Sequence, residues 1–547
     1  MSRFVSQALV GTLVGASFAT ATAAQLPSAA APAGQAFATS EASMLRTDTP
    51  ATNSGWTVQP IFTVSEDWAG YQPPGILDGI GVFDVPNRPN TIRAVVNHEL
   101  NPANGYPYTL ANGTMLTGAR LSTFLISRNF AGGTADFSVN RIGPAYDAIY
   151  DRQGAEVTDP AQINETGSDM DGLARFCSSK SVVGGTYGFV DNVYFTGEET
   201  GKPFHPHGGT AWALDVEGRE LWAVPALGRG AWENFTALET GDDGTVALLG
   251  GDDTAGAPLY LYVGQKDALG DGSFLDRNGL AVGDLYAWRA DNGDLDPEAF
   301  NGLNEFRSGA FVAVNVRDEA QAGQEGYDAL GYADSDTLQA SADALGCFSF
   351  SRPEDLATNP GDGTQAVFAS TGRGSLYPSD NWGTVYVVDV DFSDLSALLI
   401  VIHDADDLAV PDEGIRSPDN LEWSSDGKIY LQEDRSTSPS TLFGGVTGVE
   451  ASVWQLDPVT RATRRIAEVD RSAVAPADAT DSGAGDLGNW ETSGVIDIAP
   501  FFPTVIEGAR ILLLDVQAHG IQDGSIGGNP LLDEGGQLLV LWKTTQD

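Results

Sequence analysis

Short runs of apolar or alternating residues recur along the chain from Trp56 onward, and each is closed by Gly, Asp or Asn. Such runs, joined by turn-rich connections, are typical of the strands of a sandwich, barrel or propeller. They cover residues 92–99, 120–126, 210–215, 245–249, 259–263, 366–370, 384–389, 428–433, 453–457, 511–515 and 537–542. Long helical stretches are scarce, and 65 glycines and 28 prolines supply the turns. The pattern predicts an all-β protein.

A looser unit repeats within this pattern: an acidic-tipped strand, a loop, and a strand ending in Asp or a turn. It is found at 428–434 with 453–457, at 366–372 with 384–389, and at 245–253 with 259–264. Paired strands at a recurring but irregular spacing indicate propeller blades with insertions. We expect a β-propeller of six irregular blades. Its inner strands would converge on a central channel and bring distant carboxylates together at one mouth.

The ends of the chain differ in composition from its middle. Residues 1–24 have the basic start, apolar stretch and small-residue end of a secretory signal peptide. Residues 25–50 form an Ala/Pro/Ser-rich leader that we expect to be disordered. Residues 51–547 would form a single propeller domain with helical or loop insertions near 147–171 and 302–344, the second of which has the best local helix composition.

The chain has 547 residues, with 29 Lys and Arg against 75 Asp and Glu, a net charge of −46. This balance disfavours nucleic acids and anionic membranes as partners. The acids either solvate the surface or, in part, bind cations. No apolar run after the signal is long enough to span a bilayer. We therefore expect a secreted protein, periplasmic or extracellular, without a membrane anchor and acting as a monomer.

One segment combines a soft ligand with hard ligands. Cys177 lies about twenty residues before a predicted strand that ends in Glu198 and Glu199, two carboxylates after a glycine. A thiolate and carboxylates at this spacing favour a metal site. Because the only other cysteine is Cys347, a Cys177–Cys347 disulfide in an oxidising compartment remains the alternative.

Other acids lie at the ends or shoulders of their own predicted strands. They are Glu99, Glu233, Asp252, Glu354, Asp419, Asp434 and Glu491. A Pro-acid pair recurs at Pro353-Glu354 and Pro418-Asp419, which favours both acids facing the channel. Arg352 offers a planar fork suited to phosphate, although a surface Arg–Glu pair is the common alternative for such a residue.

The common catalytic templates are missing from the chain. It has no Gly-x-Ser-x-Gly elbow, no His-Glu-x-x-His motif, no phosphate-binding Walker loop and no EF-hand loop. Carboxylates in excess over one or two arginines favour hard cations such as calcium. A metal of this kind would polarise a phosphoryl oxygen.

An ordered set of motifs between residues 90 and 542 resembles the PhoX-like alkaline phosphatases. The set is Asn97-His98-Glu99, Cys177, Gly197-Glu198-Glu199-Thr200, Glu233, Gly251-Asp252-Asp253, Arg352-Pro353-Glu354, Pro418-Asp419-Asn420, Gln432-Glu433-Asp434, Glu491-Thr492-Ser493-Gly494 and Asp515-Val516-Gln517-Ala518-His519. The resemblance implies a secreted β-propeller with a central cluster of calcium and iron. It implies a phosphoric monoester hydrolase that acts on small phosphate esters.

Carried over by position, the resemblance makes Cys177 the thiolate that bridges iron. It implies that Glu99, Glu198, Glu233, Glu354 and Glu491 are metal ligands, and we expect four further acids to join them: Glu199, Asp252, Asp419 and Asp434. Arg352 would clamp the substrate phosphate, with Asn420 and His519 as further substrate contacts. One departure, the sequence Ser178-Ser179-Lys180 after the cysteine and a longer path to the paired Glu, keeps a calcium-only relative open.

The leading hypothesis is a secreted metal-dependent phosphatase that hydrolyses phosphomonoesters at a central carboxylate-metal cluster and scavenges phosphate. Two alternatives remain open from the sequence. One is a calcium-dependent propeller acting as an esterase, phosphodiesterase or lactonase. The other is a non-catalytic calcium-binding propeller in which the same acids are structural.

Overall fold

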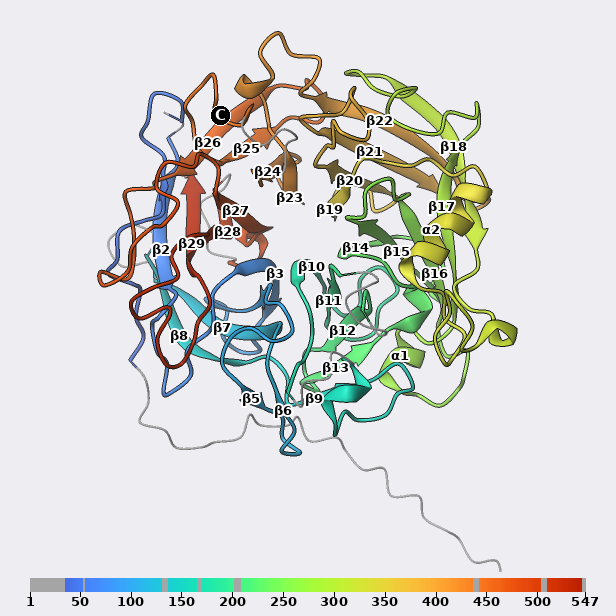
Figure 1. The fold of residues 1–547 in the computed structure, drawn as a ribbon, viewed down its shortest axis with the longest axis horizontal. Coiled ribbons are helices and arrows are strands. Elements are labelled where there is room, and N and C mark those ends of the chain that lie inside the picture. Colours follow the sequence, from blue (N-terminus) through green and yellow to red (C-terminus); the bar gives the residue numbers. More distant parts are fainter. Residues whose placement is uncertain are drawn as a thin grey trace, which may run out of the picture.

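The structure is a computed structural model, and it describes residues 35–52, 55–129, 136–164, 170–200, 208–435, 442–502 and 509–543. The sheets of these residues surround a common centre as six blades (Figure 1). The predicted all-β propeller is thus confirmed. The predicted signal peptide, 1–24, lies outside the described residues. Within them, no helix is long and apolar enough to cross a membrane.

Each blade is built on four antiparallel strands that follow one another from the centre outward. The first three blades are β3 (Leu77–Asp84), β4 (Thr91–His98), β7 (Arg120–Asn129) and β8 (Asp136–Pro144); β10 (Phe176–Val182), β11 (Val193–Glu198), β12 (Ala211–Asp215) and β13 (Glu220–Ala223); and β14 (Trp232–Leu238), β15 (Thr245–Asp252), β16 (Tyr260–Gln265) and β17 (Gly283–Ala290). The fourth and fifth are β19 (Pro353–Thr358), β20 (Gln365–Ser370), β21 (Thr384–Asp391) and β22 (Ser396–Asp404), then β23 (Pro418–Trp423), β24 (Ile429–Glu433), β25 (Ser452–Leu456) and β26 (Thr463–Val469).

The sixth blade closes the ring with a strand from the other end of the chain. It comprises β27 (Trp490–Asp497), β28 (Arg510–Ala518), β29 (Gly535–Lys543) and, as its outer strand, β2 (Thr57–Thr63). A shorter strand, β1 (Leu45–Arg46), pairs with β26 of the fifth blade. Met44 and Leu45 are buried in the core. The folded domain therefore includes residues 44–46, which the sequence pattern had left in the disordered leader.

The two predicted insertions join blades at their outer edges. Residues near 147–171 contribute β9 (Ala148–Tyr150), which pairs in parallel with β13, and the 3-10 turn η2 (Pro160–Gln162). Residues 302–344 contribute β18 (Phe306–Val314), the turn η4 (Glu319–Gln321) and helix α2 (Ser335–Ala344). Because β18 pairs with both β17 and β22, the third and fourth blades share one sheet. The Asp334 carboxylate caps α2 by accepting from the Thr337 amide.

Smaller elements complete the chain. They are the ribbon β5 (Tyr108–Thr109) and β6 (Met115–Leu116), the helix α1 (Phe274–Arg277), and the turns η3 (Pro225–Leu227), η5 (Pro411–Glu413) and η7 (Ala499–Phe501). The core lies between the blades, since each sheet packs on both faces. This explains why strands such as β28 are continuous apolar runs, with Leu512, Leu513 and Leu514 all fully buried.

The inner strands begin in the same way in every blade. The first residue of β3, β10, β14, β19, β23 and β27 pairs with the last residue of the next strand out. In the first five of these strands the register then shifts before pairing resumes, which is a β-bulge. Bulges re-aim side chains and are common beside functional sites. Five of the six strand starts therefore share one bulged geometry at their second residue, while β27 stays in register there.

Candidate active site

The second residue of every inner strand is an acid or a thiol. In blade order these residues are Asp78, Cys177, Glu233, Glu354, Asp419 and Glu491. All six are buried. They come from positions more than four hundred residues apart, and the propeller brings them to the same level of its axis. We call them the first ring.

A second ring comes from the strands one step further out. The residues that directly follow β4, β11, β15, β20, β24 and β28 are Glu99, Glu199, Asp253, Thr371, Asp434 and His519. Because each of these strands ends opposite the start of an inner strand, its next residue lies beside the first ring. Thr371 confirms this placement, since its hydroxyl donates to the Glu354 carboxylate.

The two rings enclose a cavity of about 220 Å³. It is lined by Glu99, Arg175, Cys177, Glu199, Glu233, Asp253, Arg352, Glu354, Asp419, Asp434, Glu491 and His519. Eight carboxyl groups thus face two guanidinium groups, one imidazole and one thiol. Uncompensated charges are costly to bury, so an arrangement with this excess of acids calls for cations or protons.

Arg175 precedes the inner strand β10 and holds two carboxylates of the second ring. Its Nη2 lies 2.8 Å from Glu99 Oε1 and 2.7 Å from Glu199 Oε2. The Glu199 charge, with that of Glu99, raises the pKa of Arg175 further above its usual range despite burial. Its backbone is left-handed, with φ of 41°. The residues before β3 and β23, Ile76 and Ser417, share this uncommon conformation, which is typical of strained functional turns.

Arg352 occupies the same place before the inner strand β19. Its Nε and Nη2 each lie 2.6 Å from an oxygen of Asp253, a two-pronged contact, and Nη2 is 3.3 Å from Glu354. This pairing outweighs burial and holds the pKa of Asp253 below its usual value. The Arg352 side chain is 18% exposed and lines the cavity, and its Nη1 has no partner within the described residues. One edge of the guanidinium that was predicted to hold phosphate therefore binds Asp253.

Three overlapping groups of residues have the spacing of a metal site. They are Asp78 with Glu99 and Cys177, Cys177 with Glu199 and Glu233, and Glu233 with Glu354 and Asp419, with ligand atoms within 4.8 Å of one another in each group. Cys177 and Glu233 each belong to two groups. Asp419 Oδ1 is buried without a hydrogen-bond partner within the described residues. Since a buried acceptor is seldom left unpaired, the donor set fits hard cations bridged by shared ligands.

The pKa values of the first ring reflect this crowding. Burial, followed by the charges of Glu354 and Glu199, raises the pKa of Glu233 well above its usual value. Burial and neighbouring acids do the same for Glu354 and Asp419. Burial also raises the pKa of the Cys177 thiol. Without cations these groups favour their protonated forms, so cation binding must displace protons.

His519 lies at the side of the cavity, between two carboxylates. Its Nδ1 contacts Glu534 Oε2, and its Nε2 lies 3.5 Å from Glu491 Oε2. Burial lowers the pKa of His519, but the hydrogen bonds to Glu491 and Glu534 outweigh burial and raise it well above its usual value. These two hydrogen bonds therefore favour the protonated form of the imidazole.

A polar layer lies directly behind the first ring. The Cys177 thiol donates to Asp78 Oδ2 at 3.1 Å, and Asn420 Nδ2 donates to Asp78 Oδ1 at 3.1 Å. Burial and the Glu99 charge raise the pKa of Asp78 to about 7. The Asn420 oxygen accepts from Ser493 Oγ at 2.8 Å. Asn420, predicted as a substrate contact, thus supports Asp78 and is not among the residues that line the cavity.

Two of the predicted metal ligands also lie away from the cavity lining. Glu198 accepts from the backbone amides of Ala174 and Thr210, at 3.0 and 3.3 Å. Asp252 Oδ1 accepts from the amides of Ala231 and Thr254 at 2.9 and 3.1 Å. Both carboxylates are buried and fasten the loops that carry cavity residues. They are the last residues of β11 and β15, one position before the second ring, which explains their placement.

The structure brings ten of the thirteen predicted site residues to the cavity. They are Glu99, Cys177, Glu199, Glu233, Arg352, Glu354, Asp419, Asp434, Glu491 and His519. Both cysteines are free and buried. Cys347 packs in the apolar core between the second and third blades, whereas Cys177 contacts Asp78. The alternative prediction of a Cys177–Cys347 disulfide is therefore wrong for this structure.

Sequence reasoning did not select three residues of this region: Asp78, Arg175 and Asp253. A signal for each of them is visible once the blades are aligned. Asp78 follows an apolar residue at a strand start, as do Glu233 and Glu491. Asp253 follows the last residue of its strand, as Glu199 does. Arg175 directly precedes an inner strand, as Arg352 does.

The raised pKa values predict an unusual pH dependence for the metal-free protein. A carboxyl group with a raised pKa in the folded state contributes stability below its unfolded pKa and loses that contribution as pH rises through the folded pKa. Chelated protein should therefore melt at least about 5 °C lower at pH 8 than at pH 5. Calcium should remove most of this difference. Scanning calorimetry with and without chelator checks this, and a flat profile in chelator would contradict it.

Two comparisons with known proteins find a similarity to one family. A model of the alkaline phosphatase PhoX family matches residues 215–479. A solved structure of Pseudomonas fluorescens PhoX in complex with vanadate, a transition state analogue, aligns with a TM-score of 0.62 and 17% identity, covering 93% of this chain and 98% of that one. The chain is similar to this family over residues 215–479. No curated protein matches its sequence.

Other solved structures are much less similar. An exo-β-1,3-galactanase from Phanerochaete chrysosporium aligns with a TM-score of 0.32 and 11% identity, covering 89% of this chain and 96% of that one. That likeness carries no functional argument. The PhoX family match spans the third to fifth blades, with Glu233, Asp253, Arg352, Glu354 and Asp419. The matched family is described as alkaline phosphatase PhoX, and the match supports the enzyme class of an alkaline phosphatase-like phosphoric monoester hydrolase.

Proposed function

We propose that this PhoX-like chain is a secreted metal-dependent phosphatase that hydrolyses small phosphomonoesters at the cavity formed by the two rings. The observation that carries the proposal is the convergence of acids from six blades on two arginines within one cavity. The acids are in excess and share ligand spacing, which supports several cations, with calcium as the main metal and iron as a second. Because the sequence after Cys177 departs from the family pattern, elemental analysis is needed to measure how much of the bound metal is iron.

The residues divide into those that hold cations and those that hold phosphate. The three groups built around Cys177 and Glu233 would hold the metals, and bound metals would supply Lewis-acid polarisation of the phosphoryl oxygens. Arg352 lines the cavity, and its Nη1, which has no partner among the described residues, would bind a phosphoryl oxygen. Asp253 fixes the plane of the Arg352 guanidinium, so little orientation entropy is lost when phosphate binds.

Two more positive groups face the same space. Arg175 is 35% exposed and bridges Glu99 and Glu199, which keeps its charge at the mouth of the cavity. His519 also lines the cavity and, when protonated, would donate from Nε2, either to a phosphate oxygen or to Glu491. Together these groups would stabilise the charge that spreads over the equatorial oxygens in phosphoryl transfer.

The direct test is a substrate panel on the purified full chain with calcium and ferric iron present. An aryl phosphomonoester should release phosphate, whereas the matched bis-aryl phosphodiester and an aryl lactone should react at least about 100-fold more slowly. Preference for the diester or the lactone would overturn the proposed substrate class. Failure to turn over any of the three would support a structural role for the acids.

A further inference from the structure

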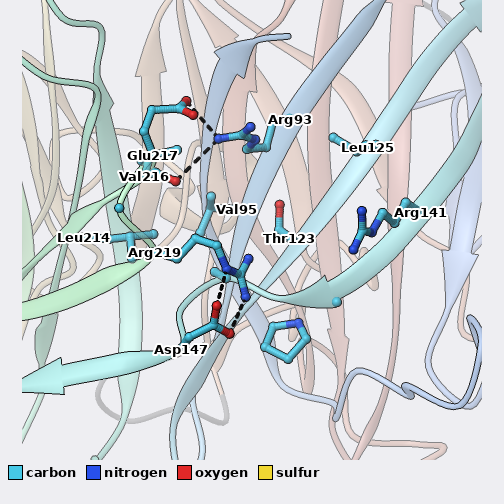
Figure 2. A pocket seen from close by; sticks show the side chains of 14 residues that line it. Arg93, Val95, Thr123, Leu125, Arg141, Asp147, Leu214, Val216, Glu217 and Arg219 are labelled. Carbon is cyan, nitrogen blue, oxygen red and sulfur yellow. Dashed lines mark hydrogen bonds and ion pairs between the residues drawn. The ribbon is translucent and has the colours of Figure 1, made fainter. Parts of the chain in front are cut away.

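A second cavity, of about 270 Å³, lies between the outer parts of the first and second blades. None of its lining residues lines the central cavity. Its walls include Val95 of β4, Leu125 of β7 and Leu214 of β12, which form an apolar surface. Three arginines, Arg93, Arg141 and Arg219, surround this surface (Figure 2). In a chain with more than twice as many acids as bases, three arginines at one cavity are an unusual concentration of positive charge.

Two of these arginines are held in place by acids at the rim. Arg219 contacts Asp147 through Nε and Nη2, at 2.6 and 2.7 Å. Arg93 Nη1 donates to Glu217 Oε1 at 2.9 Å. Each contact fixes one edge of a guanidinium group, and Arg219 Nη1 and Arg93 Nη2 have no partner within the described residues. Both side chains are about one-fifth exposed, so their charges are only partly screened by water.

The remaining polar groups have no partner in the part of the chain that the structure describes. Arg141, from β8, makes no ion pair or hydrogen bond there. The Thr123 hydroxyl, from β7, is buried and unpaired. Figure 2 shows this hydroxyl between the three guanidinium groups. Buried hydroxyls are seldom left without a partner, so the position next to Thr123 suits a ligand that accepts hydrogen bonds.

We propose that this cavity binds a small organic oxyanion, with a carboxylate or phosphoryl head group on an apolar body. The free groups are donors, and the two rim acids leave one positive charge in excess, which selects an anion. A water molecule takes about 30 Å³, so a bare oxyanion would leave most of the cavity unfilled. The apolar walls account for the rest, because they would pack against the body of the ligand.

Isothermal titration of the full chain with phenylphosphonate and benzoate tests this site. The two probes share one ring and differ in head group, and the P–C bond of the phosphonate resists hydrolysis. The titrations use the Arg352→Ala protein, because this substitution should weaken binding of the probes at the central cavity. We expect at least one probe to bind with Kd below about 1 mM. Adding Arg141→Gln should weaken binding at least tenfold, and adding Thr123→Val should weaken it severalfold.

The matched control is Arg88→Gln, which removes an exposed arginine from the same blade and should change Kd less than twofold. Arg141 has no contact to lose, so its replacement should leave the melting temperature unchanged and separate lost binding from misfolding. The tighter probe identifies the head group. Absence of binding by both probes, or equal binding in the Arg141→Gln protein, would overturn the proposal.

Discussion

Arg352→Ala should lower kcat/KM for an aryl phosphomonoester by about 1000-fold, the scale on which preorganised charge at a reacting group acts. The reason is the position of the Arg352 side chain, which lines the carboxylate cavity and leaves Nη1 without a partner among the described residues. Arg352→Lys should recover only part of the loss, because an ammonium keeps the charge but lacks the fork. Steady-state kinetics on the metal-loaded protein measures both variants.

Two results separate this role from a structural one. Removal of Arg352 leaves Asp253 without its partner, so some loss of stability is expected, and the melting temperature must be recorded with the rate. Arg373→Ala, an exposed arginine of the same blade, is the matched control and should retain full activity. A loss of less than threefold in a folded Arg352→Ala protein would show that another group binds the phosphate.

Glu233→Gln should lower activity at least about 100-fold and reduce the bound metal, since Glu233 belongs to two of the three ligand groups. The amide keeps the size of the side chain and removes the charge. In chelated protein at pH 8 the same change should raise the melting temperature, because the amide cannot take on the charge that burial and the acids around Glu233 disfavour. With metal present the melting temperature should fall. A melting temperature that rises in the chelated protein and falls in the metal-loaded protein would identify Glu233 as a metal ligand.

The control for this variant is Glu468→Gln. Glu468 is also a buried glutamate, but it lies on β26 and pairs with Arg46 at 2.7 Å, far from the cavity lining. The Glu468→Gln substitution should leave activity and metal content unchanged. If Glu233→Gln retained both metal and rate, the shared-ligand arrangement would be wrong.

The fold class and most of the cavity could be predicted from the sequence because both follow a local pattern. Strand runs with Gly and Asp turns repeat through the chain, and acids such as Glu354 and Asp419 stand next to a proline at strand starts. Once six strands converge, acids at equivalent positions must meet. The same reasoning missed Asp78, which follows Leu77 and has neither a proline nor an aromatic residue at its strand start.

Other features depend on one-residue differences that the pattern could not resolve. Glu198 and Glu199 are adjacent carboxylates, yet only Glu199 lines the cavity, because Glu198 is the last paired residue of β11 and accepts from backbone amides. Asp252 and Asp253 differ in the same way. The start of the folded domain was placed too late, because the two-residue strand β1 is too short to show a periodic pattern.

The central claim is that acids from all six blades share cations in one cavity and that these cations support hydrolysis. Elemental analysis of natively produced protein, paired with phosphate release before chelation, after chelation and after return of calcium and iron, tests it most directly. The account predicts bound metal, loss of activity with the metal, and recovery when the metal is returned. Full activity in protein that contains no metal would contradict it.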